Sequence, residues 1–370
     1  MKTVFTIIVA LHGLIHLLGF VKAFKIAEVN DLTIPISKSS GVLRLIACVL
    51  FLITAILFAS RSDYWWLVGI LSVLLSQTLI VIYWQDAKYA TLPNFLILLV
   101  CVGAYANFQF MNMVESEVFE MNAVRTTGQE AGTQQPENLP LPVKKWLSVS
   151  NIMSLGRIET VYLEQETFIK LKPNQKDWYS GTAKQYFTTQ PPAFIWHVDL
   201  TMNPLIQVSG RDKYVNGKGE MLIKLFSLIS VADAKENHKV DQGTLQRYLA
   251  EIAWFPSAAL NPYIRWQPID NRTAKATMSY NGVSGSGTFY FSKDGDLQKF
   301  IAMRYKEVDD ESQPIEWVAE VLRTEEKNGV RVPTRMQATW QMESGAWTWL
   351  KLNITDIRYN IAKEPIVQRD

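Results

Sequence analysis

Long uncharged apolar runs dominate the first 111 residues of the sequence. Each approaches the roughly 20 residues that a helix needs to cross a bilayer. Aromatic residues at Tyr64–Trp66 and Tyr83–Trp84 flank one run, as the interfacial belts of membrane helices do. A cleaved signal peptide would explain only the first run, and Lys22 interrupts any small-residue cleavage site there. The pattern predicts four transmembrane helices: Val4–Val21, Leu45–Ser60, Tyr64–Trp84 and Thr91–Met111.

From Arg157 onward, apolar and polar residues alternate with a period of two. Phe194, Trp196 and Val198 fall on one face of a predicted strand, with His197 on the other. Such alternation is typical of antiparallel strands with one buried and one wet face. Hairpin turns are predicted where asparagine or aspartate precedes glycine, because these residues accept positive φ angles. We expect ten to twelve strands, with turns at Asn216-Gly217, Asn281-Gly282, Asp294-Gly295 and Asn328-Gly329.

The stretch Asp241–Pro256 is the one strong amphipathic helix signal within this strand-rich region. Asp241 is a suitable N-cap and Pro256 a suitable stop. A lone helix must bury its apolar stripe, and only the surrounding strands can receive it. The predicted fold is a curved antiparallel sheet, or half-barrel, with this helix in its concave face. The stripe comprises Leu245, Tyr248, Leu249, Ile252 and Phe255.

These patterns divide the chain into three parts. Residues 1–114 form the predicted transmembrane region, and residues 115–142 form a polar linker rich in Gly, Gln and Pro towards its end. Residues 143–370 form the β domain, opened by a short helix near Pro142 that carries Val143, Trp146 and Leu147.

Charge changes the picture in two ways. Residues 1–111 hold seven basic and four acidic residues, hence +3, so the remainder is −1 within the total of +2. The basic pI therefore reflects membrane-flanking residues and not a nucleic-acid surface. The positive-inside rule puts the first and third loops in the cytoplasm and the β domain outside it. The loop residues that decide this are Lys22, Lys25, Lys38 and Lys88.

Candidate chemistry is sparse. His12 and His16 share one face of the first span, where they either bond across helices or supply two ligands for metal or proton transfer. Arg247 and Glu251 are either an ordinary ion pair four residues apart or a buried pair in which Glu251 has a raised pKa. The motifs predict no catalytic residue, metal site or cofactor, and Cys48 and Cys101 lie inside apolar runs, which excludes a disulfide framework.

Aromatic residues make a stronger case for binding. One helix cannot fill a curved sheet of this size, and a leftover apolar cavity is what a lipid-binding domain needs. Its expected walls are Trp196, Tyr248, Leu249, Ile252, Trp254 and Trp340.

Three stretches carry a family resemblance: Ala183–Leu200, Arg211–Glu236 and Asp241–Ala258. They lie within a region from Pro142 to about Lys306 that resembles a bacterial family known only as a domain of unknown function. The resemblance implies a membrane-associated bacterial protein, and brings no activity and no functional residues. The predicted sheet with its inserted helix also looks like the lipoprotein-carrier fold of the periplasm, which does not fix a function.

Three functions remain open at this stage. The first is a multi-pass protein of the bacterial inner membrane whose periplasmic or extracellular β domain binds a hydrophobic ligand or lipid beside the bilayer. The second is a non-catalytic module that docks another envelope protein. The third is an enzyme of unknown reaction, which a deep polar cleft holding Glu251 would favour.

Overall fold

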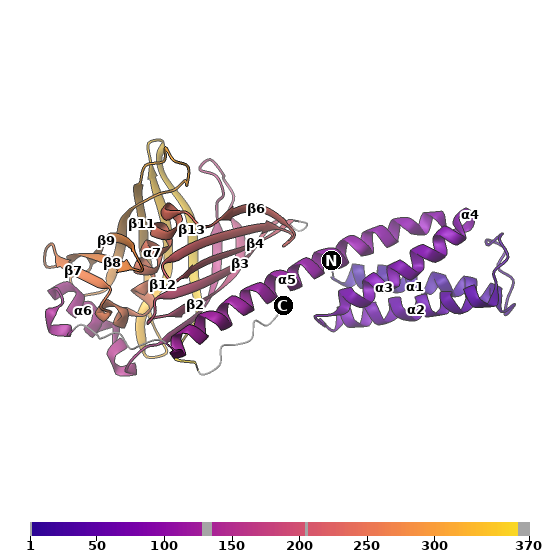
Figure 1. Ribbon diagram of the computed structural model, residues 1–370, viewed down its shortest axis with the longest axis horizontal. Coiled ribbons are helices and arrows are strands. Elements are labelled where there is room, and N and C mark those ends of the chain that lie inside the picture. The colour runs from indigo at the N-terminus through magenta and orange to yellow at the C-terminus, as the bar shows by residue number, and fades with distance from the viewer. Residues whose placement is uncertain (1, 128–134, 204–205, 362–370) are drawn as a thin grey trace. The chain divides into compact units, whose positions relative to one another are not determined.

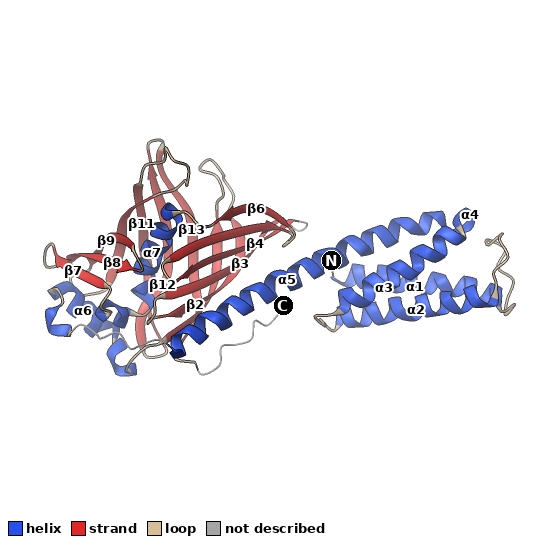
Figure 2. Cartoon of the chain, viewed as in Figure 1, coloured by secondary structure: helices blue, strands red, loops and turns tan. Residues whose placement is uncertain are grey.

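A computed structural model describes residues 2–127, 135–203 and 206–361 (Figure 1). The chain separates into two compact units, one up to Asn112 and one beginning at Met113. The first unit is helical, and the second is a large sheet with helices, as the colouring in Figure 2 shows.

The first unit holds helices suited to a membrane. The described chain has four helices long and apolar enough to cross a bilayer. A buried network of histidine, serine and asparagine side chains bonds α1 to α3 and α5. The helices are α1 (Lys2–Ala23), α2 (Lys38–Ala59), α3 (Trp65–Ile82), the short α4 (Trp84–Ala87) and η1 (Lys88–Ala90), and α5 (Thr91–Thr127).

Helix α5 corrects one prediction. The fourth apolar run was expected to end at Met111 and a linker to begin at residue 115, but α5 continues to Thr127. The continuation has its own buried stripe at Val114, Val118 and Met121, whose spacing of four and three is helical. The length needed to cross a bilayer therefore did not predict where α5 ends. Positions 128–134 of the predicted linker lie outside the described residues.

Glu117 joins the second half of α5 to the sheet. Its carboxylate forms ion pairs with Arg211 at 3.1 Å and Lys213 at 3.0 Å, both on β4. Glu220 on β5 pairs with the same two bases at 3.0 Å each. Asp212, between these two bases, faces the opposite way, into the concave side. The cluster therefore holds the part of α5 that follows Met113 to the outer face of the sheet.

In the described part of the second unit, thirteen antiparallel strands form one continuous sheet in the order β6-β5-β4-β3-β2-β1-β13-β12-β11-β10-β9-β8-β7. The half-barrel prediction is confirmed. The count exceeds the expected ten to twelve, since an edge strand of five residues such as β7 carries little alternation. The strands are β1 (Thr160–Ile169), β2 (Tyr179–Thr188), β3 (Ala193–Asn203), β4 (Ile206–Val215), β5 (Lys218–Leu225), β6 (Ile229–Ala234), β7 (Ile264–Pro268), β8 (Thr273–Tyr280), β9 (Val283–Phe291), β10 (Leu297–Arg304), β11 (Ile315–Lys327), β12 (Val330–Met342) and β13 (Gly345–Tyr359).

The predicted turns lie where the sequence placed them. Asn216-Gly217 joins β4 to β5, Asn281-Gly282 joins β8 to β9, and Asn328-Gly329 joins β11 to β12. In all three pairs both residues have positive φ, from 47° to 80°. Gly295, between β9 and β10, has φ 102°. These turns fix the register of the flanking strands, and hence which residues face inward.

Helix α7 (His238–Glu251), continued by η4 (Ile252–Trp254) and η5 (Pro256–Leu260), lies inside the curve of the sheet (Figure 1). It begins three residues earlier than predicted, with Asn237 as its N-cap. Asp241 instead turns inward, where its carboxylate accepts from Gly219 N at 2.8 Å and pairs with Lys218 at 3.0 Å. Asp241 therefore does not cap the helix. Its carboxylate instead bonds α7 to β5.

Glycines allow α7 to approach the sheet from two sides. A Cβ on Gly219 of β5 would lie 2.7 Å from the Val240 carbonyl oxygen, and one on Gly285 of β9 would lie 2.7 Å from Gln246 Cγ. Gln246 also donates to the Ser286 carbonyl of β9 and the Met303 carbonyl of β10. The helix thus bridges the two wings of the half-barrel.

The predicted short helix is α6 (Leu141–Ser150), preceded by η2 (Pro136–Asn138) and followed by η3 (Ile152–Leu155). Its Val143, Trp146 and Leu147 join the core, as the sequence indicated. That core also takes in the α7 stripe and the inward residues of both wings, so one hydrophobic interior serves the whole β unit.

Candidate functional site

A cavity of about 510 Å³ remains between α7 and the concave face of the sheet. This lies within the range of about 300–1,000 Å³ typical of small-molecule pockets. Its lining is mainly apolar, with Val198 and Leu200 from β3 and Leu350 and Leu352 from β13. Six tryptophans face it: Trp196, Trp254, Trp317, Trp340, Trp347 and Trp349.

Two connections border the opening of the cavity. Leu171, in the β1–β2 connection, is 48% exposed, and Val308, in the β10–β11 connection, is 45% exposed, although both line the cavity. Trp349 on β13 lies beside the β1–β2 connection, since its carbonyl accepts from Lys170 N at 2.8 Å. The site therefore has an apolar rim that a nonpolar molecule can cross.

Arg247 places a charge on the helical wall of this apolar space. Its Nε donates to Glu251 at 2.8 Å, one helical turn on, and its Nη1 donates to Asp212 on β4. The guanidinium also lies 4.7 Å from the centroid of the Trp196 ring, a cation–π distance. One arginine thus joins two buried carboxylates and an aromatic wall.

A chain of hydrogen bonds continues from this arginine into the sheet. Gln185 on β2 donates to Glu251 Oε2 at 2.8 Å, and Gln165 on β1 donates to Gln185 at 3.1 Å. Trp196 Nε1 in turn donates to Gln165 at 3.0 Å. Both oxygens of Glu251 are engaged, so the carboxylate holds α7 against β1, β2 and β3.

Burial sets the proton affinity of these acids. It raises the pKa of Glu251 above its ordinary value, and Arg247 offsets only part of that effect. Burial also raises the pKa of Asp212, again against the opposing charge of Arg247. For Arg247 burial alone would lower the pKa, but Glu251 and Asp212 outweigh it and raise it. The arginine therefore stays charged, and it lies within ion-pair distance of both carboxyl groups.

Arg304, the last residue of β10, is a second cation on the wall. Its Nη2 donates to the Gly243 carbonyl of α7 at 2.8 Å, and its guanidinium lies 4.3 Å from the Trp317 ring centroid. Burial, with the nearby charge of Arg247, lowers its pKa to about 10, so it remains protonated at neutral pH.

Comparison with known proteins matches residues 137–359 to DUF6920, described as a family of unknown function. The chain belongs to this family. The match runs from η2 to the end of β13, further than the sequence resemblance that reached only about Lys306. A search of curated proteins found no match.

Two solved structures are similar to this DUF6920 chain at the level of fold. One is a DUF1329 family protein from Desulfovibrio piger, 12% identical, with a TM-score of 0.36 over 60% of this chain and 95% of that one. The other is a LolA superfamily protein from Nitrosomonas europaea, 10% identical, with a TM-score of 0.32 over 62% of this chain and 96% of that one. At these scores neither likeness bears on function.

The structure brings together only part of the predicted site. Trp196, Trp254 and Trp340 line the cavity, as do Arg247 and Glu251. The α7 stripe residues do not, and each is fully buried in the core. Tyr248, for example, donates its hydroxyl to the Thr188 carbonyl at 3.0 Å. The stripe residues concerned are Tyr248, Leu249 and Ile252.

The stripe residues do not line the cavity because a different face of α7 does. Val240, Thr244, Arg247 and Glu251 line it, at intervals of four, three and four residues. That face is more polar than the apolar stripe. Hydrophobicity therefore predicted the wrong face of α7 as the cavity wall. Arg304, Asp212, Trp347 and Trp349 were also missed, because only the register of distant strands brings them to the helix.

His12 and His16 have polar partners within the first unit. His12 Nε2 lies 2.8 Å from Asn94 Oδ1 on α5, and His16 Nε2 lies 2.9 Å from Ser76 Oγ on α3. Asn94 also donates to Ser76 and to Gln77. Across the described ranges, no group of three metal-ligating side chains includes the pair. This geometry matches the interhelical bonding interpretation.

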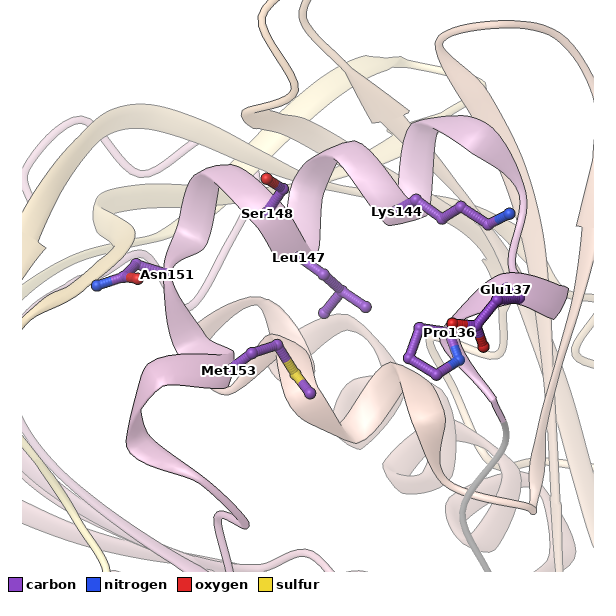
Figure 3. A pocket seen from close by; sticks show the side chains of 7 residues that line it. All are labelled: Pro136, Glu137, Lys144, Leu147, Ser148, Asn151 and Met153. Atoms are coloured by element: carbon purple, nitrogen blue, oxygen red, sulfur yellow. The ribbon is translucent and has the colours of Figure 1, made fainter.

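A second hollow, of about 390 Å³, lies beside α6 (Figure 3). Leu147 and Met153 point into it, whereas Asn151 points away. It has no buried charged group that would orient a ligand, and the six-tryptophan cavity is therefore the stronger candidate.

Proposed function

We propose that the β unit of this DUF6920 protein binds a hydrophobic ligand, a lipid or an acyl chain, in the cavity between α7 and the sheet. The observation that carries the proposal is an open, largely apolar cavity of about 510 Å³ that α7 leaves unfilled. An empty apolar space of this size forfeits packing contacts, so a molecule that fills it gains them together with the hydrophobic contribution.

The proposed setting is the bacterial inner membrane, with the β unit in the periplasm or outside the cell. Four helices suited to span a bilayer and the lysines of the first and third loops support it. A reporter active only in the cytoplasm, fused after Asp370, should stay silent. Strong reporter activity would reverse this topology while leaving the binding proposal in place.

Mass spectrometry of the purified full-length protein tests the binding. We expect a co-purifying lipid in the parent. Ala338→Phe should remove it, because Ala338 lines the cavity and a benzyl group there occupies ligand space. Val318→Phe is the matched control: it lies on the neighbouring strand β11, next to the inward-facing Trp317 and hence on the other face of the sheet. Equal lipid content in all three proteins, or none in any, would contradict the proposal.

The second candidate is an interaction module, which the β5–β6 hairpin favours. Strand β6 is an edge of the sheet, and an exposed edge can pair with another chain. The hairpin and this edge carry exposed apolar residues: Phe226, Leu228, Ile229 and Val231. A partner protein recovered with the parent and lost on Val231→Lys would favour this function. An enzyme acting through Glu251 has less support, since both of its carboxylate oxygens are already bonded.

A further inference from the structure

The charges that line the cavity do not balance. Five basic residues face it, Lys170, Lys239, Arg247, Arg304 and Lys306, against two acids, Asp212 and Glu251. Arg247 is already paired with both acids. The remaining lining charge is positive, which favours an anionic molecule over a neutral or cationic one.

Arg304 is a lining cation that pairs with no carboxylate that the structure describes. Among the described residues it forms no ion pair, and its Nε is buried with no hydrogen-bond acceptor. The three lysines have other partners: Lys306 pairs with Glu307, Lys239 donates to the carbonyls of Asp309 and Ser312, and Lys170 lies 4.8 Å from the Trp178 ring centroid. A buried guanidinium is costly unless an acceptor satisfies it, so Arg304 marks a place for acceptor oxygens.

Three indole groups of the same cavity share this property. The Nε1 atoms of Trp317, Trp347 and Trp349 are buried and donate to no acceptor in the described chain. Trp196 and Trp254, by contrast, donate to Gln165 and to the Pro333 carbonyl. Buried N–H groups nearly always have a partner. The three indole groups and Arg304 Nε are, among the described residues, four unpaired donors on side chains that line one cavity, and they therefore point to a ligand with several acceptors.

We infer that the ligand is an amphiphile with an anionic head, a carboxylate or a phosphate, whose oxygens accept from Arg304 and the tryptophan N–H groups while its acyl chain lies along the apolar walls. This inference rests on the proposed function and names its ligand class. Carboxylate and phosphate oxygens are acceptor-only and match the guanidinium fork, which a hydroxyl or an ester matches less well.

The test uses tryptophan quenching in the full-length protein held in amphipol. The probes are dibrominated stearate, its methyl ester, the corresponding alcohol, and a lysophosphatidic acid with the same chain. Bromine quenches indoles on contact, so binding reports on the cavity tryptophans. We expect at least one acid to bind about 10-fold or more tightly than the alcohol and ester, from one added charge-assisted hydrogen bond. The ranking of the two acids separates a carboxylate from a phosphate head.

The variants assign the preference to Arg304. Arg304→Met should abolish the preference for the acid, while Arg304→Lys should keep part of it because the charge remains. Trp317→Phe should weaken acid binding about 3- to 10-fold with little effect on the alcohol. Arg323→Met, at a residue 58% exposed, is the control for a change in net charge and should match the parent. If Arg304→Met fails to fold, the parent's preference for the acid and the effect of Trp317→Phe still test the anionic-head inference.

The outcomes separate the two proposals. Equal binding of acid, ester and alcohol by the parent would overturn the anionic-head inference and leave hydrophobic binding standing. Binding of no probe would overturn both. Acid selectivity that survives unchanged in Arg304→Met and in Trp317→Phe would place the head elsewhere and refute the assignment.

Discussion

Arg247 is the common partner of two buried carboxylates, and its replacement by methionine removes both ion pairs at once. The side chains of Asp212 and Glu251 are only 22% and 12% exposed. Breaking a buried pair by removing one member costs about 3–5 kcal/mol, because the remaining charge is left uncompensated. We therefore expect Arg247→Met to lower the free energy of unfolding by about that amount at pH 7.

The loss should depend on pH, with a definite sign. Burial already raises the pKa of both carboxyls, and without Arg247 their folded-state values rise further. A carboxyl with a raised folded pKa contributes most below its unfolded pKa, about 3.9 for Asp and 4.3 for Glu. Its contribution falls as pH rises to the folded pKa, by about 1.4 kcal/mol per pH unit. Between pH 5 and 7 the deficit should therefore grow towards the full loss of about 3–5 kcal/mol expected at pH 7.

Urea unfolding of the full-length protein in mild detergent measures this, followed by tryptophan emission. Nine of the twelve tryptophans lie between residues 146 and 349, so emission reports mainly on the β unit. Arg331→Met is the matched control, because Arg331 is 43% exposed where it pairs with Asp296, and should change stability by less than about 1 kcal/mol. Adding Glu251→Gln to Arg247→Met should recover part of the loss. A loss below about 1 kcal/mol, or one that does not vary between pH 5 and 8, would refute the reasoning.

Three further predictions follow from other contacts. Gly219→Ala should destabilise the β unit by about 1–3 kcal/mol, seen as a lower melting temperature, because the added methyl meets Thr244 Oγ1 and the α7 backbone; an unchanged melt would mean that α7 can shift freely. Glu117→Gln should speed hydrogen exchange in α5 beyond Met113, since Arg211 and Lys213 lose an ion-pair partner; equal exchange would show that apolar packing alone holds α5. Asn94→Leu should weaken the helical unit by about 1–2 kcal/mol in detergent unfolding, through lost bonds to His12 and two α3 side chains; no change would exclude a structural role for that network.

Much of the fold could be predicted because its signals are local. An Asn-Gly pair requires only its own backbone conformation, and each such turn fixed a hairpin in the structure. The apolar runs of the first unit and the two-residue alternation of the second are likewise carried by neighbouring residues. Asp241 shows the limit: its residue type fits an N-cap, yet a bond to Gly219, 22 residues away, decides its place.

The site was less accessible to sequence reasoning because its members meet only through long-range pairing. Asp212, Arg247 and Arg304 lie on β4, α7 and β10, and none belongs to a motif with the others. Arg304 is the last residue of β10, whose inward positions include Phe300 and Ala302. An arginine at the end of a strand is typical of a chain that is reaching solvent, so nothing in the sequence indicated that Arg304 lines the cavity. Its position against Trp317 follows from the register of β10 with β11.

The strand order also determines how the sheet can assemble. Eleven of its twelve pairings join strands that follow one another in the chain, and only β1 with β13 joins distant ones. Two meanders, β1 to β6 and β7 to β13, can therefore form from contacts of low sequence separation. Pairing of Val161 on β1 with Tyr359 on β13 closes a loop of nearly the whole unit. The chain therefore loses the entropy of closing that loop before any hydrogen bond between these strands stabilises it. The strand pairing with a large sequence separation is thus that of β1 with β13. We expect this pair to form last and to limit the folding rate.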